Sequence, residues 1–225
     1  MVKARTTAFI FATSAAREPV NQEPHNTQME PTRPTGLCDP VTAARGSFAT
    51  LGRQAPILRA GKNTMSNTLH RSLETLFREL IDGPDANAAW MLNAGDAGLL
   101  RSLDKLTASA ASAPSVTGGA SIAAHVDHVC YGLSLMNRWS QGEHDPWSTA
   151  DWRASWNRST VNNDEWAALR QELGTEARSW LEVMRAPRDY SEPRLNDAIA
   201  SIAHLAYHFG AIRQIDRSIQ GPAAS

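Results

Sequence analysis

Four of the seven histidines in this 225-residue chain lie in two compact groups. His125 and His128 belong to the segment SIAAHVDHVCYGL, and His204 and His208 belong to the segment ASIAHLAYHFGAIRQI. Residues four apart lie on one face of a helix, so His204 and His208 can direct their ring nitrogens to one point. A third imidazole from a facing helix would complete a three-nitrogen site with open positions for water or substrate.

Three imidazoles that meet at one point would do the chemistry of a metal site. Neutral histidine is the commonest ligand of zinc and of other borderline metals, and three protein ligands leave a position open for a reactant. A metal ion held there lowers the pKa of a bound water or thiol and makes it a nucleophile near neutral pH. The alternative interpretation is that these histidines are core or pocket residues, hydrogen-bonded to their neighbours.

The downstream pair lies at the border of the apolar face of its predicted helix. His204 and His208 share a stripe with Ser201, Ala211 and Ile215. The neighbouring stripe is apolar and consists of Ile202, Leu205, Phe209 and Ile212. Because such a face must be buried, we expect both imidazoles to lie next to the core.

Four other side chains close to the histidines have both a structural and a chemical interpretation. We expect Cys130 to be a small core residue rather than a nucleophile. Asp127 is a candidate to orient an imidazole by accepting its hydrogen bond. Because Asp127 is adjacent to His128 on the helix, however, its side chain points in another direction. A backbone carbonyl is therefore an equal candidate for that role. Tyr131 and Tyr207 are placed to reach a pocket, although buried tyrosines are commonly structural.

The segment 140–162 is rich in tryptophan and in polar residues, and Gly142 and Pro146 interrupt any regular pattern in it. We expect its tryptophans to cover one end of the helices; the alternative is an aromatic lid over a substrate. These tryptophans are Trp147, Trp152 and Trp156. We expect His144, in the sequence GEHDP, to be a solvated loop residue.

Apolar residues at helical spacing predict four main helices, and no run alternates as a strand would. The helices are expected from Ser66 or Asn67 to the stop at Gly83-Pro84, from Ser121 to Trp139, from Asn163 or Asp164 to Arg185, and from Pro193 to Ile219. Shorter helical stretches are expected between Trp90 and Leu106, followed by a loop over 107–120. The sequence therefore predicts an all-α protein, a four-helix bundle with short extra helices.

Composition divides the chain into two parts. Residues 1–64 are rich in proline and hold eight Lys/Arg against four Asp/Glu, a net charge of +4, which predicts a disordered extension. The alternative is upstream sequence translated from a start codon set too early, with Met65 as the true start. The apolar run Ala8–Ala12 is too short for a secretory signal. Residues 65–225 hold fourteen Lys/Arg against nineteen Asp/Glu, a net charge of −5, and are expected to form the helical domain.

These numbers also exclude several classes of protein. The negative domain argues against nucleic-acid binding. The two cysteines, Cys38 and Cys130, are too few for a disulfide framework. No apolar run approaches the roughly 20 residues that cross a bilayer, so we expect no membrane association.

The two histidine segments together resemble one known family. HVDHVCYGL, followed far downstream by HLAYHFGAIRQ, is similar to the pattern of the DinB-like (DinB/YfiT-like) superfamily of four-helix-bundle, metal-dependent enzymes. The resemblance covers about Leu69 to Ile219. His204 and His208 match the downstream pair of that pattern, and Gly210, Ile212 and Gln214 lie near its trailing motif. His128 fits the upstream position better than His125, which stays open as the alternative ligand.

The resemblance implies a divalent metal ion, Zn, Ni or Fe, held by His128, His204 and His208. It further implies a small-molecule substrate, a low-molecular-weight thiol as cosubstrate, and transfer or hydrolysis as the reaction, in the cytoplasm. Family members often carry a polar residue where this chain has Phe209, which predicts a more apolar pocket rim. The alternative function is a non-catalytic bundle with a structural metal or none, acting in stress response or dimerisation. A homodimer is open under either interpretation.

Overall fold

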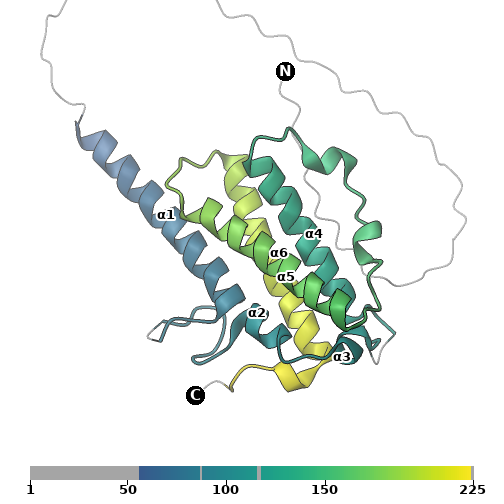
Figure 1. Cartoon of the computed structure of the whole chain (residues 1–225). Helices are drawn as coiled ribbons and strands as arrows, with labels where there is room; N and C mark the ends of the chain where they lie inside the picture. The colour runs from purple at the N-terminus through teal and green to yellow at the C-terminus, as the bar shows by residue number, and fades with distance from the viewer. Residues whose placement is uncertain (1–55, 87, 116–117, 224–225) are drawn as a thin grey trace, which may run out of the picture. The chain divides into compact units, whose positions relative to one another are not determined.

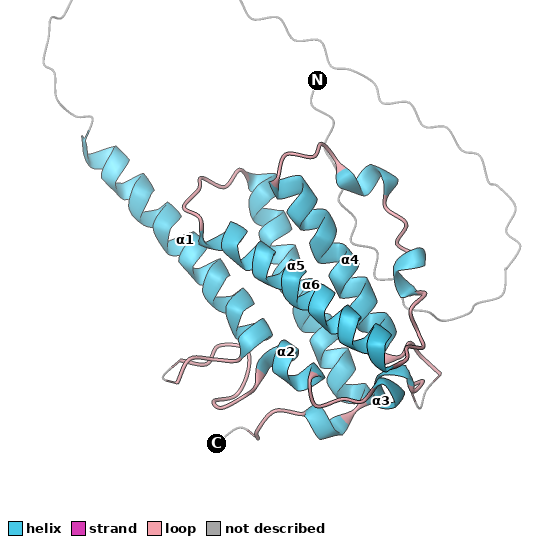
Figure 2. Ribbon diagram, viewed as in Figure 1, coloured by secondary structure: helices cyan, strands magenta, loops and turns pink. Residues whose placement is uncertain are grey.

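The computed structural model describes residues 56–86, 88–115 and 118–223, with side chains from Asn67 onward. The expectations for residues 1–55 lie outside the described residues. Within the described ranges the chain forms α-helices and short 3-10 turns and no strand, which confirms the all-α expectation (Figure 2). None of these helices is both long enough and apolar enough to cross a membrane.

Four helices of the described chain have 19 residues or more. They are α1 (Pro56–Asp82), α4 (Ile122–Ser140), α5 (Asn163–Arg185) and α6 (Glu192–Ile215). The shorter elements are α2 (Gly98–Leu103), α3 (Ala108–Ser112) and the 3-10 turns η1 (Pro146–Thr149), η2 (Ala154–Trp156) and η3 (Arg217–Ile219).

Helix α4 is the central element, and it packs against both α5 and α6 (Figure 1). Its buried residues, from Ile122 to Asn137, cover most of the helix circumference, and one stripe of Asp127, Tyr131, Ser134 and Arg138 is half-buried or exposed. In contrast, α5 buries one stripe at helical spacing, as a helix at the surface does. That stripe consists of Trp166, Leu169, Leu173, Ala177, Trp180, Leu181 and Met184. A helix enclosed on most of its sides can carry functional side chains into the interior, and α4 carries His128 there.

Helix α1 joins the same core and is also connected to α5 by ion pairs. Its buried apolar residues are Leu73, Phe77, Leu80 and Ile81. Arg178 of α5 pairs with Asp82, and Arg185 Nε lies 3.1 Å from Glu74 Oε1. These pairs are at the surface, so burial of the apolar residues supplies most of the stabilisation at this contact.

The helix boundaries differ from the sequence predictions at four places. Helix α1 begins at Pro56 rather than at Ser66, because proline is well tolerated in the first turn of a helix and a leucine- and alanine-containing run follows it. The predicted loop over 107–120 contains α3, whose N-cap Thr107 accepts a hydrogen bond from the Ala110 amide.

The other two differences concern the caps of α5 and α6. Asn162, rather than Asn163 or Asp164, caps α5, in a reciprocal capping box with Glu165. Helix α6 ends at Ile215, before the predicted Ile219, and Asp216 starts a separate 3-10 turn by accepting from the Ser218 amide.

The end of the connection between α1 and α2 is held by a buried carboxylate, that of Asp96. Asp96 accepts hydrogen bonds from Arg213 Nη2 of α6 and from the Gly98 amide, at 2.7 and 2.9 Å. Gly83, where α1 ends, has a φ of +91°, and a Cβ there would lie 2.1 Å from the Asp96 carbonyl oxygen. Only glycine fits this turn, which explains why the predicted stop at Gly83-Pro84 is confirmed.

Candidate metal centre

The four clustered histidines come from two facing helices, α4 and α6. Ser121 caps α4 by accepting from the Ala124 amide at 3.2 Å, so the helix begins one turn before His125. His128 and His208 are buried, and His125 and His204 are half-buried. Since α4 packs against α6, the two groups, far apart in sequence, meet inside the protein.

The Nε2 atoms of three histidines converge. His204 Nε2 lies 3.1 Å from His128 Nε2 and 3.0 Å from His208 Nε2. In these three side chains the atoms that could bind a metal all lie within 4.8 Å of one another. The structure thus brings together the three histidines that the sequence singled out as candidate ligands.

These distances fit a tetrahedral ion with little movement of the rings. Zinc–nitrogen bonds of about 2.0–2.1 Å place two ligand nitrogens roughly 3.3 Å apart. Three neutral imidazoles whose Nε2 atoms meet cannot all donate to one another, whereas a cation accepts a lone pair from each. Gly132 of α4 lies next to the His204 ring, and a Cβ there would be in ordinary contact with it, 3.6 Å from His204 Cε1.

His125, the alternative ligand, lies behind His208. Its Nδ1 is 2.9 Å from His208 Nδ1, on the side of that ring away from the converging Nε2 atoms. His125 therefore contacts a candidate ligand, and the compact three-nitrogen group contains His128 in its place.

A serine that the sequence analysis did not single out lies behind His128. Ser155 Oγ is 2.8 Å from His128 Nδ1 and donates its hydrogen to the Trp152 carbonyl oxygen at 2.8 Å. The serine has one hydrogen, so it must accept from His128, whose Nδ1 then carries the proton. The His128 Nε2 lone pair is left facing His204.

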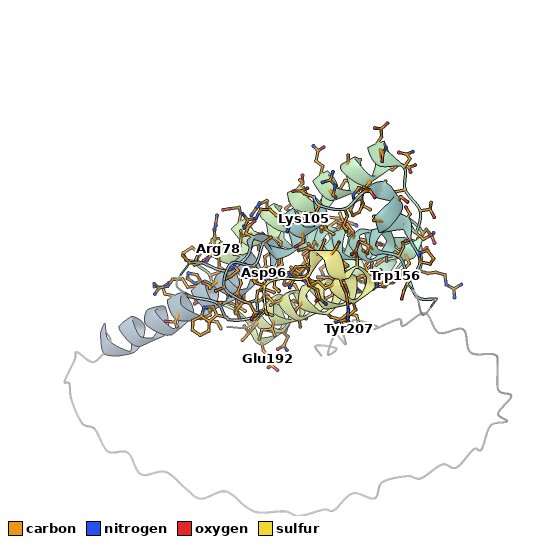
Figure 3. The ribbon with its side chains drawn as sticks, turned by 90° about the horizontal axis from the view of Figure 1, so that it is seen from below. Arg78, Asp96, Lys105, Trp156, Glu192 and Tyr207 are labelled. Carbon is orange, nitrogen blue, oxygen red and sulfur yellow. The ribbon has the colours of Figure 1, made fainter. Side chains whose placement is uncertain are left out.

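Aromatic side chains from the connection before α5 pack on the histidines. The Trp156 ring stacks on His128 with centroids 4.2 Å apart, and Trp152 lies at 5.7 Å from the same ring. The Tyr207 ring of α6 meets His208 edge-on, with ring centroids 5.0 Å apart, and is 46% exposed. Trp156 and Tyr207 are labelled in Figure 3. Trp147 packs instead on Trp139, at 5.6 Å.

Burial keeps all four histidines neutral. Desolvation lowers the pKa of His125 and of His204 to about 4. Desolvation, with repulsion from the neighbouring imidazoles, lowers the pKa of His128 to about 3 and that of His208 to about 2. Neutral imidazole is the form that binds a metal, so the rings need lose no proton near pH 7.

The remaining candidates have structural contacts. Asp127 pairs with Arg158 at 3.4 Å, away from the imidazoles, as its adjacency to His128 predicts. Burial, with nearby carboxylates, raises the pKa of Cys130 to about 12, which disfavours a thiolate. Tyr131 Oη accepts from the Asp151 amide at 3.0 Å.

Two further expectations can be compared with the structure. His144 is exposed, as expected for a solvated loop residue. The expectation of an apolar rim at Phe209 is wrong, because this ring is 2% exposed in the core, with the Arg213 guanidinium 3.9 Å from its centroid.

Sequence reasoning missed Ser155 and the contact that His125 makes. Serine is common in loops, and Ser155 has no spacing relation to His128 along the chain, so only the fold reveals the pair. His125 lies three residues before His128, so the two rings are on nearly the same face of the helix. The sequence therefore does not tell which of the two rings faces the site.

Comparison with protein-family models, with curated proteins and with solved structures gives no match to this chain.

Proposed function

We propose that this protein is a metal-dependent enzyme in which His128, His204 and His208 hold one divalent cation. The observation that carries the proposal is the convergence of three neutral Nε2 atoms from two helices, at separations of 3.0 and 3.1 Å. A three-imidazole set suits zinc, nickel or iron(II) and leaves coordination positions for a reactant.

The proposed fold is a four-helix bundle of DinB-like type, made of α1, α4, α5 and α6. Its support is the histidine pattern of the sequence together with the placement of that pattern on α4 and α6. In such bundles, metal sites are built in the interior from facing helices. The cytoplasmic location and the small-molecule substrate remain predictions that follow from the same resemblance.

The proposed chemistry is transfer or hydrolysis. A divalent ion in this set would supply Lewis acidity, enough to activate a water or a low-molecular-weight thiol near neutral pH. The protein's own residues bind and orient: the imidazoles present their lone pairs, and Trp152 and Trp156 exclude water from the His128 ring. Cys130 takes no nucleophilic part, because its pKa is raised to about 12.

A substrate screen tests the catalytic part of the proposal. The full chain is loaded with Zn²⁺, Ni²⁺ or Fe²⁺ and assayed with low-molecular-weight thiols and electrophilic acceptors, and separately with ester and amide substrates. Turnover should disappear on chelation, return when the metal is restored, and be absent in His204→Ala but present in His144→Ala. Turnover that persists in His204→Ala would overturn the assignment of the reaction to this site.

A further inference from the structure

The four histidines and Ser155 form one continuous line of hydrogen-bond contacts. It runs from His125 Nδ1 to His208 Nδ1, from His208 Nε2 to His204 Nε2, and from there to His128 Nε2. Beyond His128 it continues from Nδ1 to Ser155 Oγ and ends at the Trp152 carbonyl oxygen. Two of the candidate ligands, one on each helix, therefore have a partner on the ring nitrogen that faces away from the site.

From this line we infer that Ser155 and His125 are positioning residues for the metal centre. Each accepts the Nδ1 proton of one ligand, Ser155 from His128 and His125 from His208, and so presents the Nε2 lone pair of that ligand to the cation. The inference rests on the proposed metal site and adds to it the residues that set its ring orientations. Partners of this kind fix the tautomer of a ligating histidine and raise its basicity.

Ser155 is itself held in place by several contacts. It lies in η2, between Ala154 and Trp156, and is 5% exposed. Asp151 Oδ1 accepts from the amides of Arg153 and Ala154, at 3.1 and 2.9 Å, which fixes the turn just before the serine. The Asp151 amide in turn donates to Tyr131 of α4.

The end of the same connection is also fastened to α4, the helix that carries His128. Ser121 Oγ donates to the Ser159 carbonyl oxygen at 2.6 Å. The segment is also attached to α4 at Tyr131, at His128, and through the ion pair of Arg158 with Asp127. A segment anchored in this way holds the Ser155 hydroxyl rigidly, which a tautomer-fixing partner requires.

His125 is in an equivalent position for the second helix. It stands one turn before His128 on α4, and its ring meets Trp156 edge-on with centroids 5.3 Å apart. Packing against the indole fixes the imidazole while its Nδ1 faces His208. The orientation of a ligand on α6 is thus set by a residue of α4, which couples the site to the packing of the two helices.

Ser155 can be tested with a closely matched control in the same protein. Ser201 is also 5% exposed, also donates to the carbonyl three residues earlier, and also accepts from a ring N–H, that of Trp180. Ser155→Ala should weaken Zn²⁺ affinity, measured by chelator competition, by about 10–100-fold, and Ser155→Thr should restore it. Ser201→Ala loses the same kind of hydroxyl and should leave Zn²⁺ affinity unchanged.

For His125 the matched pair is His125→Gln and His125→Leu. Glutamine keeps an acceptor for the His208 Nδ1 proton and should hold Zn²⁺ affinity near the wild-type value. Leucine has similar bulk without an acceptor and should weaken it by about 10–100-fold. Equal affinities for the glutamine and leucine variants would overturn the role of His125.

A second readout separates this inference from the proposed function. ¹⁵N NMR of the imidazole rings in the metal-free protein should show His128 and His208 protonated at Nδ1, and Ser155→Ala should abolish this preference at His128 alone. If the tautomers are as stated but Zn²⁺ does not bind, the metal site is wrong and the hydrogen-bond assignment stands. If Zn²⁺ binds while both rings are protonated at Nε2 in the metal-free protein, the positioning inference is wrong and the metal site stands.

Discussion

At the scale of single residues, the unusual feature is a group of imidazoles deprived of water. An isolated buried histidine usually finds one hydrogen-bond partner and needs no further explanation. Here the Nε2 atoms of His128 and His208 both approach that of His204, and their opposite nitrogens are already engaged. The cluster therefore offers more lone pairs than protons at its centre, which is an arrangement that a cation stabilises.

The lowered pKa values give the metal-free protein a defined pH dependence. In the unfolded chain these histidines titrate near pH 6.5, and in the fold their pKa values are about 2 to 4. Between those limits the unfolded state binds more protons, so stability is fully present above pH 6.5 and falls as the pH drops towards 4. Urea unfolding of metal-free protein at pH 7.5 and 4.5 should show this loss.

His208→Gln is the control for that measurement, because it removes the group with the lowest pKa of the four. Its stability should change less between the two pH values than that of the wild type. An identical change in both proteins would show that the buried imidazoles do not cause the acid sensitivity.

At the scale of elements, the site depends on how the segments around α4 and α6 are fastened. The connection 141–162 is attached to α4, and the connection between α1 and α2 is attached to α6 through Asp96 and Arg213. Asp96, labelled in Figure 3, is only 4% exposed. This buried pair differs in kind from the exposed ion pairs between α1 and α5.

Asp96→Ala should therefore destabilise the protein strongly. It leaves the Arg213 guanidinium without its carboxylate in a largely buried place, and breaking such a pair typically costs about 3–5 kcal/mol. Arg185→Ala, which breaks exposed pairs with Glu74 and Glu182, should cost no more than about 1 kcal/mol. Urea unfolding at pH 7.5 measures both, and equal effects would contradict this ranking.

How far the sequence predicts the structure also depends on the element. The apolar periodicity of α5 and the glycine-proline stop of α1 are local signals, and both predict what the structure shows. The three candidate ligands were identified from helical spacing and family resemblance, and the fold brings them together. The role of Ser155 could not be predicted, because it depends on where a loop 27 residues downstream of His128 returns to α4.

At the scale of the whole molecule, the candidate metal site lies beside an extensive apolar core. Apolar residues of α1, α4, α5 and α6 make one continuous buried cluster. The helices that carry the histidines therefore have packing of their own to hold them together. This packing favours a catalytic site on a stable scaffold over the alternative, a structural metal that the fold requires.

Chelation should accordingly leave a folded protein. A cation at 100 times its dissociation constant adds about 2.7 kcal/mol to stability. For a chain of this size that corresponds to a shift of about 5–11 °C in Tm. Calorimetry should show one cooperative transition with the metal and one after chelation, with Tm values that differ by about this amount. Loss of the cooperative transition after chelation would favour the structural metal.

The most direct test of the central claim is a Co²⁺ titration of the metal-free full chain, expressed without a histidine tag and followed by visible absorption. The wild type should bind one equivalent with the spectrum of tetrahedral nitrogen and oxygen ligands. His204→Ala and His208→Ala should lose this spectrum, and His144→Ala, changed at an exposed histidine, should keep it. A wild type that binds no stoichiometric Co²⁺, or a His204→Ala variant that binds it as the wild type does, would contradict the three-histidine metal centre.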